Sequence, residues 1–484
     1  MGAVRADDIG TVAPEGRDAP RGDRTLRTTR RTRPDQDRGP AGRTRFRNWS
    51  GHVHAHPHTF ARPTSAEDLA ADVTSAAGAG QRIRAVGAGH SFTPVAAGDD
   101  VMINLDALTG IAAVDEATGR VRFRAGTRLR DIPALLAPYG LALENQGDVN
   151  PQSLAGAIST STHGTGLGFT GFAGTVTGLS LMGPDGTVRE LSADEDADTF
   201  DLARVSLGVL GILTEVEVRC VPAFDLIAEE VVTDLDDLLD GLVPRMREAD
   251  HFEFYWFPHT DSALTKTNTR VLAGQAGPGH LAEAGVRNPL LTVLDKEIVE
   301  NGALRAAVEL GARVPGLIPR INRIAQSAVS DRTYRAPGHD VFVTPRRVRF
   351  NEMEYALPLE AGVAAIREIR QAIESRGWRI SFPLEVRAAA ADDVALSTAT
   401  GRETMYIAVH RFHKEDCEEY FRVVELICRA HGGRPHWGKI HSLGAEELRA
   451  AYPRFDDFCA LRARLDPDAV FGNRFTDALI AVRR

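Results

Sequence analysis

The sequence predicts an α+β fold of two or three domains, and three observations lead to this prediction. The chain has 484 residues, and about 100–200 residues make one domain. It is 43% hydrophobic and 25% charged, as soluble globular proteins are. Short runs with alternating apolar residues, typical of strands, are interspersed with longer amphipathic segments, typical of helices. A run of about 18 apolar residues, which a membrane-crossing helix needs, does not occur.

Residues 1–42 differ from the rest of the chain. The first 50 residues hold twelve Arg against seven Asp and Glu, a net charge of +5, and have few large apolar side chains. Such a segment buries too little apolar surface to offset ordering, so we expect a disordered basic tail. No apolar stretch follows Arg30-Arg31, which argues against an export signal. The tail fits either a chain start set upstream of the folded protein or a loose basic arm.

Charge and cysteine content restrict the function class. The formal net charge of −9 leaves −14 for the chain after residue 50, which argues against a dedicated nucleic-acid binder. The four cysteines are too few and too scattered for a disulfide framework or a zinc ribbon: Cys220, Cys417, Cys428 and Cys459. We therefore expect reduced thiols and a cytoplasmic protein.

The first half shows mixed elements. A helix is expected over 64–79, with Ser65 as its N-cap and Gly80 after its end. A strand at 83–86 then runs into a glycine-rich turn. The remaining elements expected here are a helix at 129–139, strands at 101–105, 121–125 and 212–220, and a hairpin of 176–182 with 188–191 around Pro184-Asp185-Gly186.

The pattern of expected strands and helices changes near residue 225. An aromatic strand is expected at 252–257, and 280–335 reads as mainly helical. Strands and helices then alternate. We expect strands at 347–357, 379–387, 404–412 and 437–440, helices at 359–376 and 415–430, and two short helices in the last segment.

Two segments have the composition of a ligand cradle. In residues 84–91 (Arg-Ala-Val-Gly-Ala-Gly-His-Ser) a strand leads into glycines, whose backbone amides can approach a phosphate. The segment is neither a Rossmann fingerprint nor a P-loop, because the third glycine and the Gly-Lys-Ser/Thr ending are missing. Residues 152–166 are mostly small or hydroxylated and would suit a long polar ligand. A structural turn and a flexible loop are the alternatives.

Charged and histidine residues gather in three further places. Glu385 and Arg387 would share one face of a strand, as a solvated salt bridge or a working pair. Residues 434–441 hold two His and one Lys, but no zinc spacing results even with His410 and His413, so no metal is predicted. Alternate histidines at 52–58 indicate a histidine-rich surface strand rather than a metal site.

Taken together, the chain over 45–484 resembles the aldonolactone oxidase group of the vanillyl-alcohol-oxidase (PCMH-type) flavoprotein superfamily. The resemblance rests on the order of individually weak motifs: Asn48-Trp49, Val-Gly-Ala-Gly-His-Ser (86–91), Ala-Gly-Ala-Ile-Ser-Thr-Ser-Thr-His-Gly-Thr-Gly (155–166), Ser-Leu-Gly-Val-Leu-Gly-Ile (206–212), Glu-Met-Glu-Tyr (352–355), Glu-Val-Arg (385–387), His-Trp-Gly-Lys (436–439) and Leu-Asp-Pro-Asp-Ala-Val-Phe-Gly-Asn (465–473).

The resemblance implies a domain plan and a cofactor. Residues 43–225 would form a two-subdomain FAD-binding domain, 226–430 an α+β cap over the flavin, and 431–484 a segment packing back near it. His90 matches the histidine that bonds covalently to the flavin 8α-methyl in many members. The residues implied to hold FAD are Val86, Gly87, Ala88, Gly89, His90, Ser91, Gly147, Ser153, Ser159, Thr160, Thr162, His163, Gly164, Gly211, Ile212 and Asn473.

The resemblance also implies the reacting groups. The catalytic set would be Glu385, Arg387, Lys439 and His410, with Asp148 and Glu352 binding substrate. Arg387 would stabilise negative charge on reduced flavin. Lys439, its pKa lowered by burial and nearby positive charge, or His410 would help remove the substrate's hydroxyl proton. Gly147-Asp148 departs from the Ala-Ser of alditol oxidases, which favours a lactone.

The expected activity is FAD-dependent oxidation of a secondary alcohol of a sugar lactone of the D-arabinono-1,4- or L-gulono-1,4-lactone type. Hydride would pass to flavin N5, and O2 (giving H2O2) or a cytochrome- or quinone-type acceptor would reoxidise the flavin. The alternatives are an alditol oxidase such as a xylitol oxidase, a flavin-binding protein without catalysis, and a metal-dependent hydrolase. The sugar, the electron acceptor, peripheral membrane contact and the oligomeric state stay open.

Overall fold

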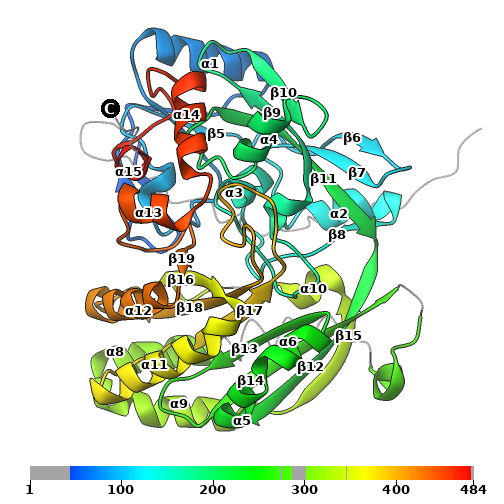
Figure 1. Ribbon diagram of the computed structural model, residues 1–484, viewed down its shortest axis with the longest axis vertical. Helices are drawn as coiled ribbons and strands as arrows, with labels where there is room; N and C mark the ends of the chain where they lie inside the picture. Colours follow the sequence, from blue (N-terminus) through cyan, green and yellow to red (C-terminus); the bar gives the residue numbers. More distant parts are fainter. Residues whose placement is uncertain (1–43, 273–274, 286–300, 345, 481–484) are drawn as a thin grey trace, which may run out of the picture. The chain divides into compact units, whose positions relative to one another are not determined.

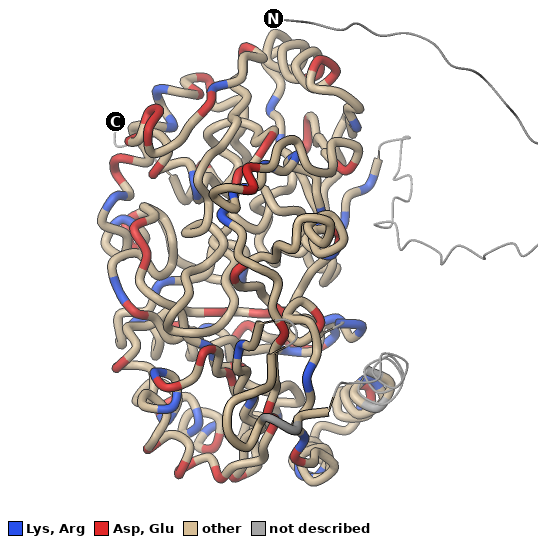
Figure 2. Tube along the Cα trace, turned by 90° about the vertical axis from the view of Figure 1, so that its right-hand side faces the viewer, with Lys and Arg blue, Asp and Glu red and all other residues tan. Residues whose placement is uncertain are grey.

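The computed structural model of the chain describes residues 44–272, 275–285, 301–344 and 346–480. The predicted tail at 1–42 lies outside the described residues. No helix among the described residues is both long and apolar enough to cross a membrane. Figure 2 shows acidic and basic residues interspersed along the described chain. All four cysteines are free, and three of them are buried.

The first half begins with two small sheets. The strands β1 (Phe46–Arg47) and β2 (His54–Ala55) pair antiparallel, and the histidines at 52, 54, 56 and 58 are exposed, as a surface strand predicts. Helix α1 (Ala66–Gly78) buries Leu69, Val73 and Ala76, and the Ser65 side chain caps it by accepting from the Asp68 amide. A parallel sheet has the order β3 (Thr59–Ala61), β5 (Val101–Asn104) and β4 (Ile83–Val86).

A six-stranded antiparallel sheet forms the rest of this half. Its order is β10-β9-β11-β7-β6, with β8 pairing to the far end of β11. It contains the predicted hairpin and the strands predicted at 121–125 and 212–220, whereas those predicted at 83–86 and 101–105 are β4 and β5 of the parallel sheet. Its strands are β6 (Ile111–Asp115), β7 (Arg120–Arg124), β8 (Leu141–Leu143), β9 (Val176–Met182), β10 (Val188–Ser192) and β11 (Ile212–Pro222). The helices of this half are α2 (Ile132–Leu136), α3 (Leu154–Ser159) and α4 (Ala197–Ala203).

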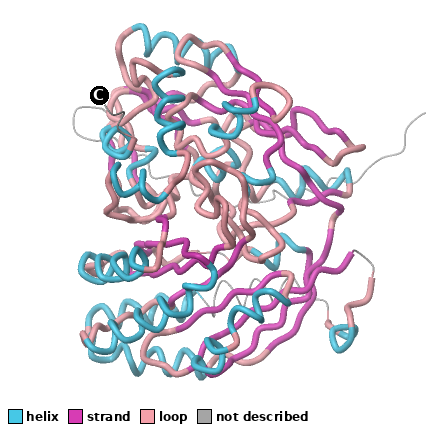
Figure 3. The backbone as a smooth tube through the Cα atoms, in the orientation of Figure 1, coloured by secondary structure: helices cyan, strands magenta, loops and turns pink. Residues whose placement is uncertain are grey.

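The chain changes sheets at Ala223, between β11 and β12. The second half builds one eight-stranded antiparallel sheet of order β15-β12-β14-β13-β17-β18-β16-β19. Its strands are β12 (Phe224–Asp234), β13 (His251–Trp256), β14 (Ser262–Leu272), β15 (Arg332–Pro337), β16 (Phe350–Pro358), β17 (Leu384–Ala389), β18 (Thr404–Phe412) and β19 (Arg434–Pro435). Loops fill the region between this sheet and the sheets of the first half (Figure 3).

Most helices of the second half pack on this sheet or beside it, whereas α14 and α15 lie against elements of the first half (Figure 1). Buried side chains of α11 and α12 (Ile366, Ile369, Phe421 and Val424) belong to the main core. The helices are α5 (Leu235–Asp240), α6 (Leu242–Glu248), α8 (Asn301–Arg313), α9 (Ile318–Ser327), α10 (Gly338–Phe342), α11 (Gly362–Ser375), α12 (Glu418–Ala430), α13 (Ala445–Ala451), α14 (Phe455–Leu465) and α15 (Arg474–Leu479).

Four expectations about elements need correction. Residues 437–440 form a turn rather than a strand, because the Gly438 amide donates to His436 Nδ1 and the Lys439 amide to the His436 carbonyl. The helix expected at 129–139 is only α2 followed by a 3₁₀ turn. The region 280–335, of which 286–300 is not described, also contains β15. The last segment has three short helices, α13 to α15, where two were expected.

The last segment contacts the first half of the chain. The Ile83 amide donates to the Val470 carbonyl, and the Phe92 amide donates to the Gly438 carbonyl. The Thr93 hydroxyl donates to the Trp437 carbonyl. Residues near 438 and 470 are thereby fixed beside the strand and turn that contain the 84–91 motif.

Candidate active site

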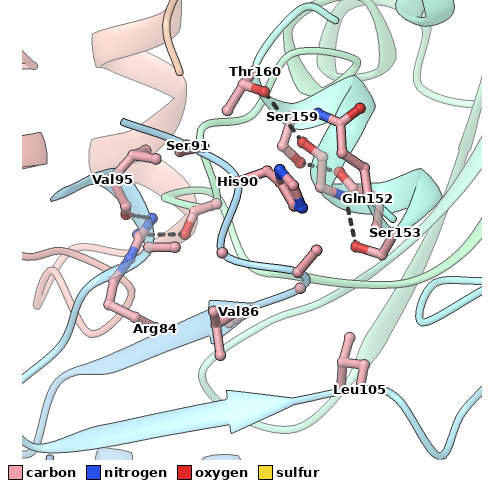
Figure 4. A pocket seen from close by; sticks show the side chains of 18 of the residues that line it. Arg84, Val86, His90, Ser91, Val95, Leu105, Gln152, Ser153, Ser159 and Thr160 are labelled. Atoms are coloured by element: carbon pink, nitrogen blue, oxygen red, sulfur yellow. Dashed lines mark hydrogen bonds between the residues drawn. The ribbon is translucent and has the colours of Figure 1, made fainter. Parts of the chain in front are cut away.

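The glycine-rich turn after β4 forms one wall of an open cavity, which measures about 1030 Å³ together with its opening to solvent. Its other walls come from α3, the approach to β11 and residues between 46 and 53. Figure 4 labels ten of the lining residues, which come from β4, the turn after it, the segment 95–105 and the region of α3. The predicted cofactor residues that line it are Val86, Gly87, Ala88, Gly89, His90, Ser91, Ser153, Ser159, Thr160, Gly211 and Ile212. The structure therefore brings three separate sequence motifs to one cavity.

Glycine is required at several points of this wall. A Cβ on Gly87 would lie 2.4 Å from the Ser153 hydroxyl, and one on Gly211 would lie 2.5 Å from the Met182 carbonyl oxygen. Gly89 and Gly211 also have positive φ, at +70° and +149°. Bare backbone thus lines the cavity where a side chain could not fit, and its amides stay open to a ligand.

Arg84 holds the walls of this cavity together. Its guanidinium donates to the carbonyls of Gly208 and Leu207, both at 2.8 Å, and to those of Val95 and Phe471. Burial lowers the pKa of Arg84 to about 10, although Asp477 and Asp466 oppose the shift, so the group stays charged at neutral pH. The sequence motif contained Arg84 but gave no sign of this role.

This cavity fits a dinucleotide such as FAD. Glycine amides, the Ser159 and Thr160 hydroxyls and the Gln152 amide line it, and these are the groups that hold phosphates and ribose hydroxyls. Asn473 lies outside the lining, because its side chain caps α15 and donates to the Pro94 and Ala97 carbonyls. Gly164 also lies outside, packed against the Asn145 side chain.

His90 stands where this cavity meets a second one, since it lines both. Its ring stacks on Trp49 at a centroid distance of 5.5 Å. Burial, with the positive charges of Lys439 and Arg128, lowers the His90 pKa to about 4. The imidazole is therefore neutral at physiological pH and keeps a nitrogen lone pair, which a covalent bond to a cofactor requires.

The second cavity, about 780 Å³ together with its opening to solvent, contains the predicted reacting groups in its lining. Gly147, Asp148, Thr162, His163, Glu352, Glu385, Arg387, His410 and Lys439 all line it. Glu385 and Arg387 share a face of β17, as predicted, and they form a buried ion pair with each other. Arg387 Nε lies 3.0 Å from Glu253 Oε2, and Arg387 Nη2 lies 3.5 Å from Asp148 Oδ1. Arg387 is thus fixed on three sides by carboxylates.

Arg346 completes this cluster and has no counterpart in the sequence expectations. It follows α10 and reaches Asp148 Oδ2 with Nε at 3.1 Å and Nη2 at 2.6 Å. Its Nη2 also lies 3.5 Å from Glu385 Oε2. No short motif marks Arg346, since only the path of the chain after α10 brings it to the cavity.

Lys439 carries a different charge state from the expected one. Burial lowers its pKa, but the ion pair with Glu352 and the nearby Glu354 outweigh burial, so the pKa of Lys439 is raised. The expectation that burial and positive neighbours depress it is therefore wrong, because the nearest charges are carboxylates. Lys439 remains an ammonium and is not a base at neutral pH.

His410 is placed to exchange a proton with a ligand in the cavity. Its Nδ1 lies 3.0 Å from the Pro383 carbonyl oxygen, which can only accept, so Nδ1 donates that hydrogen bond. Its Nε2 lies 3.6 Å from Glu352 Oε1, and the residue lines the cavity. Glu352 thus lies between His410 and Lys439.

Another buried cluster of side chains lines the second cavity. The nearest side-chain nitrogen or oxygen atoms of His163, Glu354 and His436 lie within 4.8 Å of one another, the only such group of three potential metal ligands among the described residues. His436 Nδ1 accepts from the Gly438 amide, so Nε2 carries a proton and cannot bind a cation in this tautomer. His163 bonds to the Gly164 carbonyl and to Glu354. The cluster is best described as a hydrogen-bonded network.

The fold and these two joined cavities define an FAD-dependent oxidoreductase. Two family models match the chain, an FAD-binding domain over residues 57–192 and D-arabinono-1,4-lactone oxidase over 216–479. The chain belongs to the D-arabinono-1,4-lactone oxidase family.

Relatives cover nearly the whole chain. An L-gulono-1,4-lactone dehydrogenase of Mycobacterium tuberculosis is 43% identical over 89% of this chain and 97% of its own length. An alditol oxidase of a Streptomyces species is 31% identical over 90% and 99%, and the mouse L-gulonolactone oxidase is 30% identical over 89% and 97%. Cholesterol oxidase from B. sterolicum shares the fold, with a TM-score of 0.74 and 17% identity over 90% of this chain and 96% of that one.

Proposed function

We propose that the protein oxidises a secondary alcohol of a sugar-derived 1,4-lactone, of the L-gulono or D-arabinono type, with FAD as the hydride acceptor. The observation that carries the proposal is the second cavity, where two buried charge clusters line one space that joins the glycine cradle at His90. The names of the relatives support lactone chemistry, since this chain is 43% identical to an L-gulono-1,4-lactone dehydrogenase.

Four residues of the second cavity have separate roles in this reaction. Bound FAD supplies the hydride acceptor. His410 Nε2 takes the hydroxyl proton of the substrate, and Glu352 stabilises the imidazolium that forms. Lys439, held as an ammonium by Glu352, donates to the reacting oxygen. Arg387, fixed by three carboxylates, would donate hydrogen bonds from its guanidinium to negative charge on the reduced cofactor.

We further propose the domain plan of the sequence prediction. Residues 43–225 hold FAD, covalently through His90, 226–430 cover the flavin, and 431–484 close the cofactor cavity from the other side. The hydrogen bond from Arg84 to the Phe471 carbonyl supports this last role. Free and mostly buried cysteines support a reducing compartment such as the cytoplasm. The electron acceptor is O2 or a cytochrome- or quinone-type molecule.

The experiment is a substrate and acceptor panel with protein purified after flavin-replete expression. L-gulono-1,4-lactone, D-arabinono-1,4-lactone, xylitol and sorbitol are tested in air for H2O2 and with cytochrome c or a soluble quinone. Turnover of at least one lactone in preference to the polyols supports the proposal. A colourless protein overturns the cofactor assignment, and preference for the polyols replaces the lactone by an alditol.

A further inference from the structure

Two arginines contact the same pair of carboxylates from different elements. Arg387 lies on β17, whereas Arg346 follows α10. Both contact Asp148, at 3.5 Å and 2.6 Å, and both contact Glu385. The Thr344 amide also donates to the Asp148 carbonyl at 3.1 Å, which fixes the chain beside Arg346 to the loop that contains Asp148. We call Asp148, Glu385, Arg346 and Arg387 the charge square.

The charge square pairs two carboxylates with two guanidiniums, and Glu253 adds a third carboxylate at 3.0 Å from Arg387. Burial, with Asp148 and Glu253, raises the pKa of Glu385, although Arg387 and Arg346 oppose the shift. Burial raises the pKa of Asp148, but Arg387 and Arg346 outweigh it and hold the Asp148 pKa well below its usual range. Burial opposes the charge of Arg346, yet Asp148 and Glu385 hold its pKa above the usual value. Asp148 is thus a permanent anion that receives two guanidiniums and cannot serve as a base.

The charge square leaves donors but no unpaired positive charge at the cavity. Arg346 bonds Asp148 and Glu385 through Nε and Nη2, and its Nη1 has no hydrogen-bond partner among the described residues. Glu352 and Glu354 add two carboxylates to the same lining, and Lys439, paired with Glu352, adds one ammonium. A neutral ligand with a carbonyl oxygen meets a free N–H donor, whereas an anionic ligand meets carboxylates. This selects for an uncharged ester carbonyl.

We propose that Arg346 is a specificity-determining residue that binds the carbonyl oxygen of a neutral aldono-1,4-lactone through Nη1, and that the charge square rejects the ring-opened aldonate. The inference rests on the proposed function and adds the group that distinguishes a lactone from a polyol. A polyol has no carbonyl to accept this bond. The aldonate carries the same hydroxyls as the lactone but brings a negative charge to a cavity whose positive charges are already paired.

The test compares wild type with Arg346→Gln and Arg346→Lys. Arg335→Gln is the matched control, because Arg335 forms a half-buried ion pair with Asp225 and does not line the cavity. Flavin reduction is followed without oxygen against L-gulono-1,4-lactone concentration. Xylitol and L-gulonate are tested by the same assay, either as substrates or as ligands that compete with the lactone.

For Arg346→Gln we expect a loss of about 10- to 100-fold in kcat/KM for the lactone, mainly through KM, as for one hydrogen bond from a charged donor. Binding of xylitol should change by less than about twofold, since it gains nothing from that donor. Arg346→Lys keeps the positive charge but not the paired N–H donors of the guanidinium, so its kcat/KM for the lactone should fall less than that of Arg346→Gln. Arg335→Gln should behave as wild type.

Two results overturn the inference. One is an Arg346→Gln protein that loses lactone and xylitol binding equally, and the other is one that loses neither. If Arg346→Gln fails to retain flavin, the lactone-to-xylitol ratio of Arg346→Lys decides in the same way. A wild-type protein whose flavin no lactone reduces refutes the proposed function itself, which distinguishes the two failures.

Discussion

Replacing Glu352 by Gln tests the acid–base assignment most sharply. The change keeps the size of the side chain and removes the negative charge that lies 3.6 Å from His410 Nε2 and next to Lys439. His410 then loses the partner that stabilises its imidazolium when it takes the substrate proton. The proton-transfer step should become slower, while the glycine cradle for FAD is untouched.

The size of the effect follows from the distance and the burial. At 3.6 Å and an effective dielectric constant of about 20, the attraction between Glu352 and a His410 imidazolium is about 5 kcal/mol. Lys439 already neutralises part of this charge, so a net value of about 1.5–3 kcal/mol, typical of a charged hydrogen bond, is the better figure. It corresponds to a reduction rate about 10- to 150-fold lower.

The assay is the rate of flavin reduction at saturating lactone without oxygen. Glu229→Gln is the matched control, because it alters a His–Glu pair, with His280 at 2.8 Å, that does not line either cavity. Glu229→Gln should reduce at the wild-type rate. A Glu352→Gln protein that binds FAD and reduces within about twofold of wild type would refute the role of His410 and Glu352.

Three further predictions concern the cofactor and stability. His90→Ala should give a protein whose flavin is released by acid precipitation, whereas the wild-type pellet should stay yellow; a colourless wild-type pellet would contradict the covalent bond. Arg84→Met should lower the melting temperature and the FAD content, because three buried carbonyls and the half-buried Gly208 carbonyl lose a donor, at about 1–3 kcal/mol for each buried group. The matched change at an exposed arginine, Arg82→Met, should lower neither. Burial raises the Glu352 pKa, but Lys439 outweighs it and lowers the value to about 2; Glu352 therefore contributes stability above about pH 4.3 that is lost as pH falls toward 2. Thermal melts across this window should fall more steeply for wild type than for Glu352→Gln, and parallel curves would exclude the contribution.

Much of the fold could be predicted because the local signals agree with the final structure. The N-cap at Ser65 and the hairpin of β9 and β10 lie where the sequence places them. The sequence does not predict the long strands β12 and β14, because they carry Glu, Lys, Asn and Thr at many positions and show weak alternation. Pairing with neighbours far along the chain, rather than local pattern, makes them strands.

The candidate site likewise contains residues that the sequence predicts and residues that it does not. The period of a strand was enough to place Glu385 and Arg387 on one face, and the structure sets both at the cavity. Arg346 could not be found, because nothing in its neighbours along the chain marks a residue that crosses to Asp148. The charge state of Lys439 could not be found either, since it depends on Glu352 and Glu354, which approach only through β16.

The most direct measurement is a single turnover of the purified yellow protein with L-gulono-1,4-lactone or D-arabinono-1,4-lactone without oxygen, with hydrogen or deuterium on the carbon that bears the reacting hydroxyl. The account predicts that at least one lactone bleaches the flavin within one turnover and that deuterium slows the bleaching. A flavin that dithionite reduces but that stays oxidised with every lactone would contradict it.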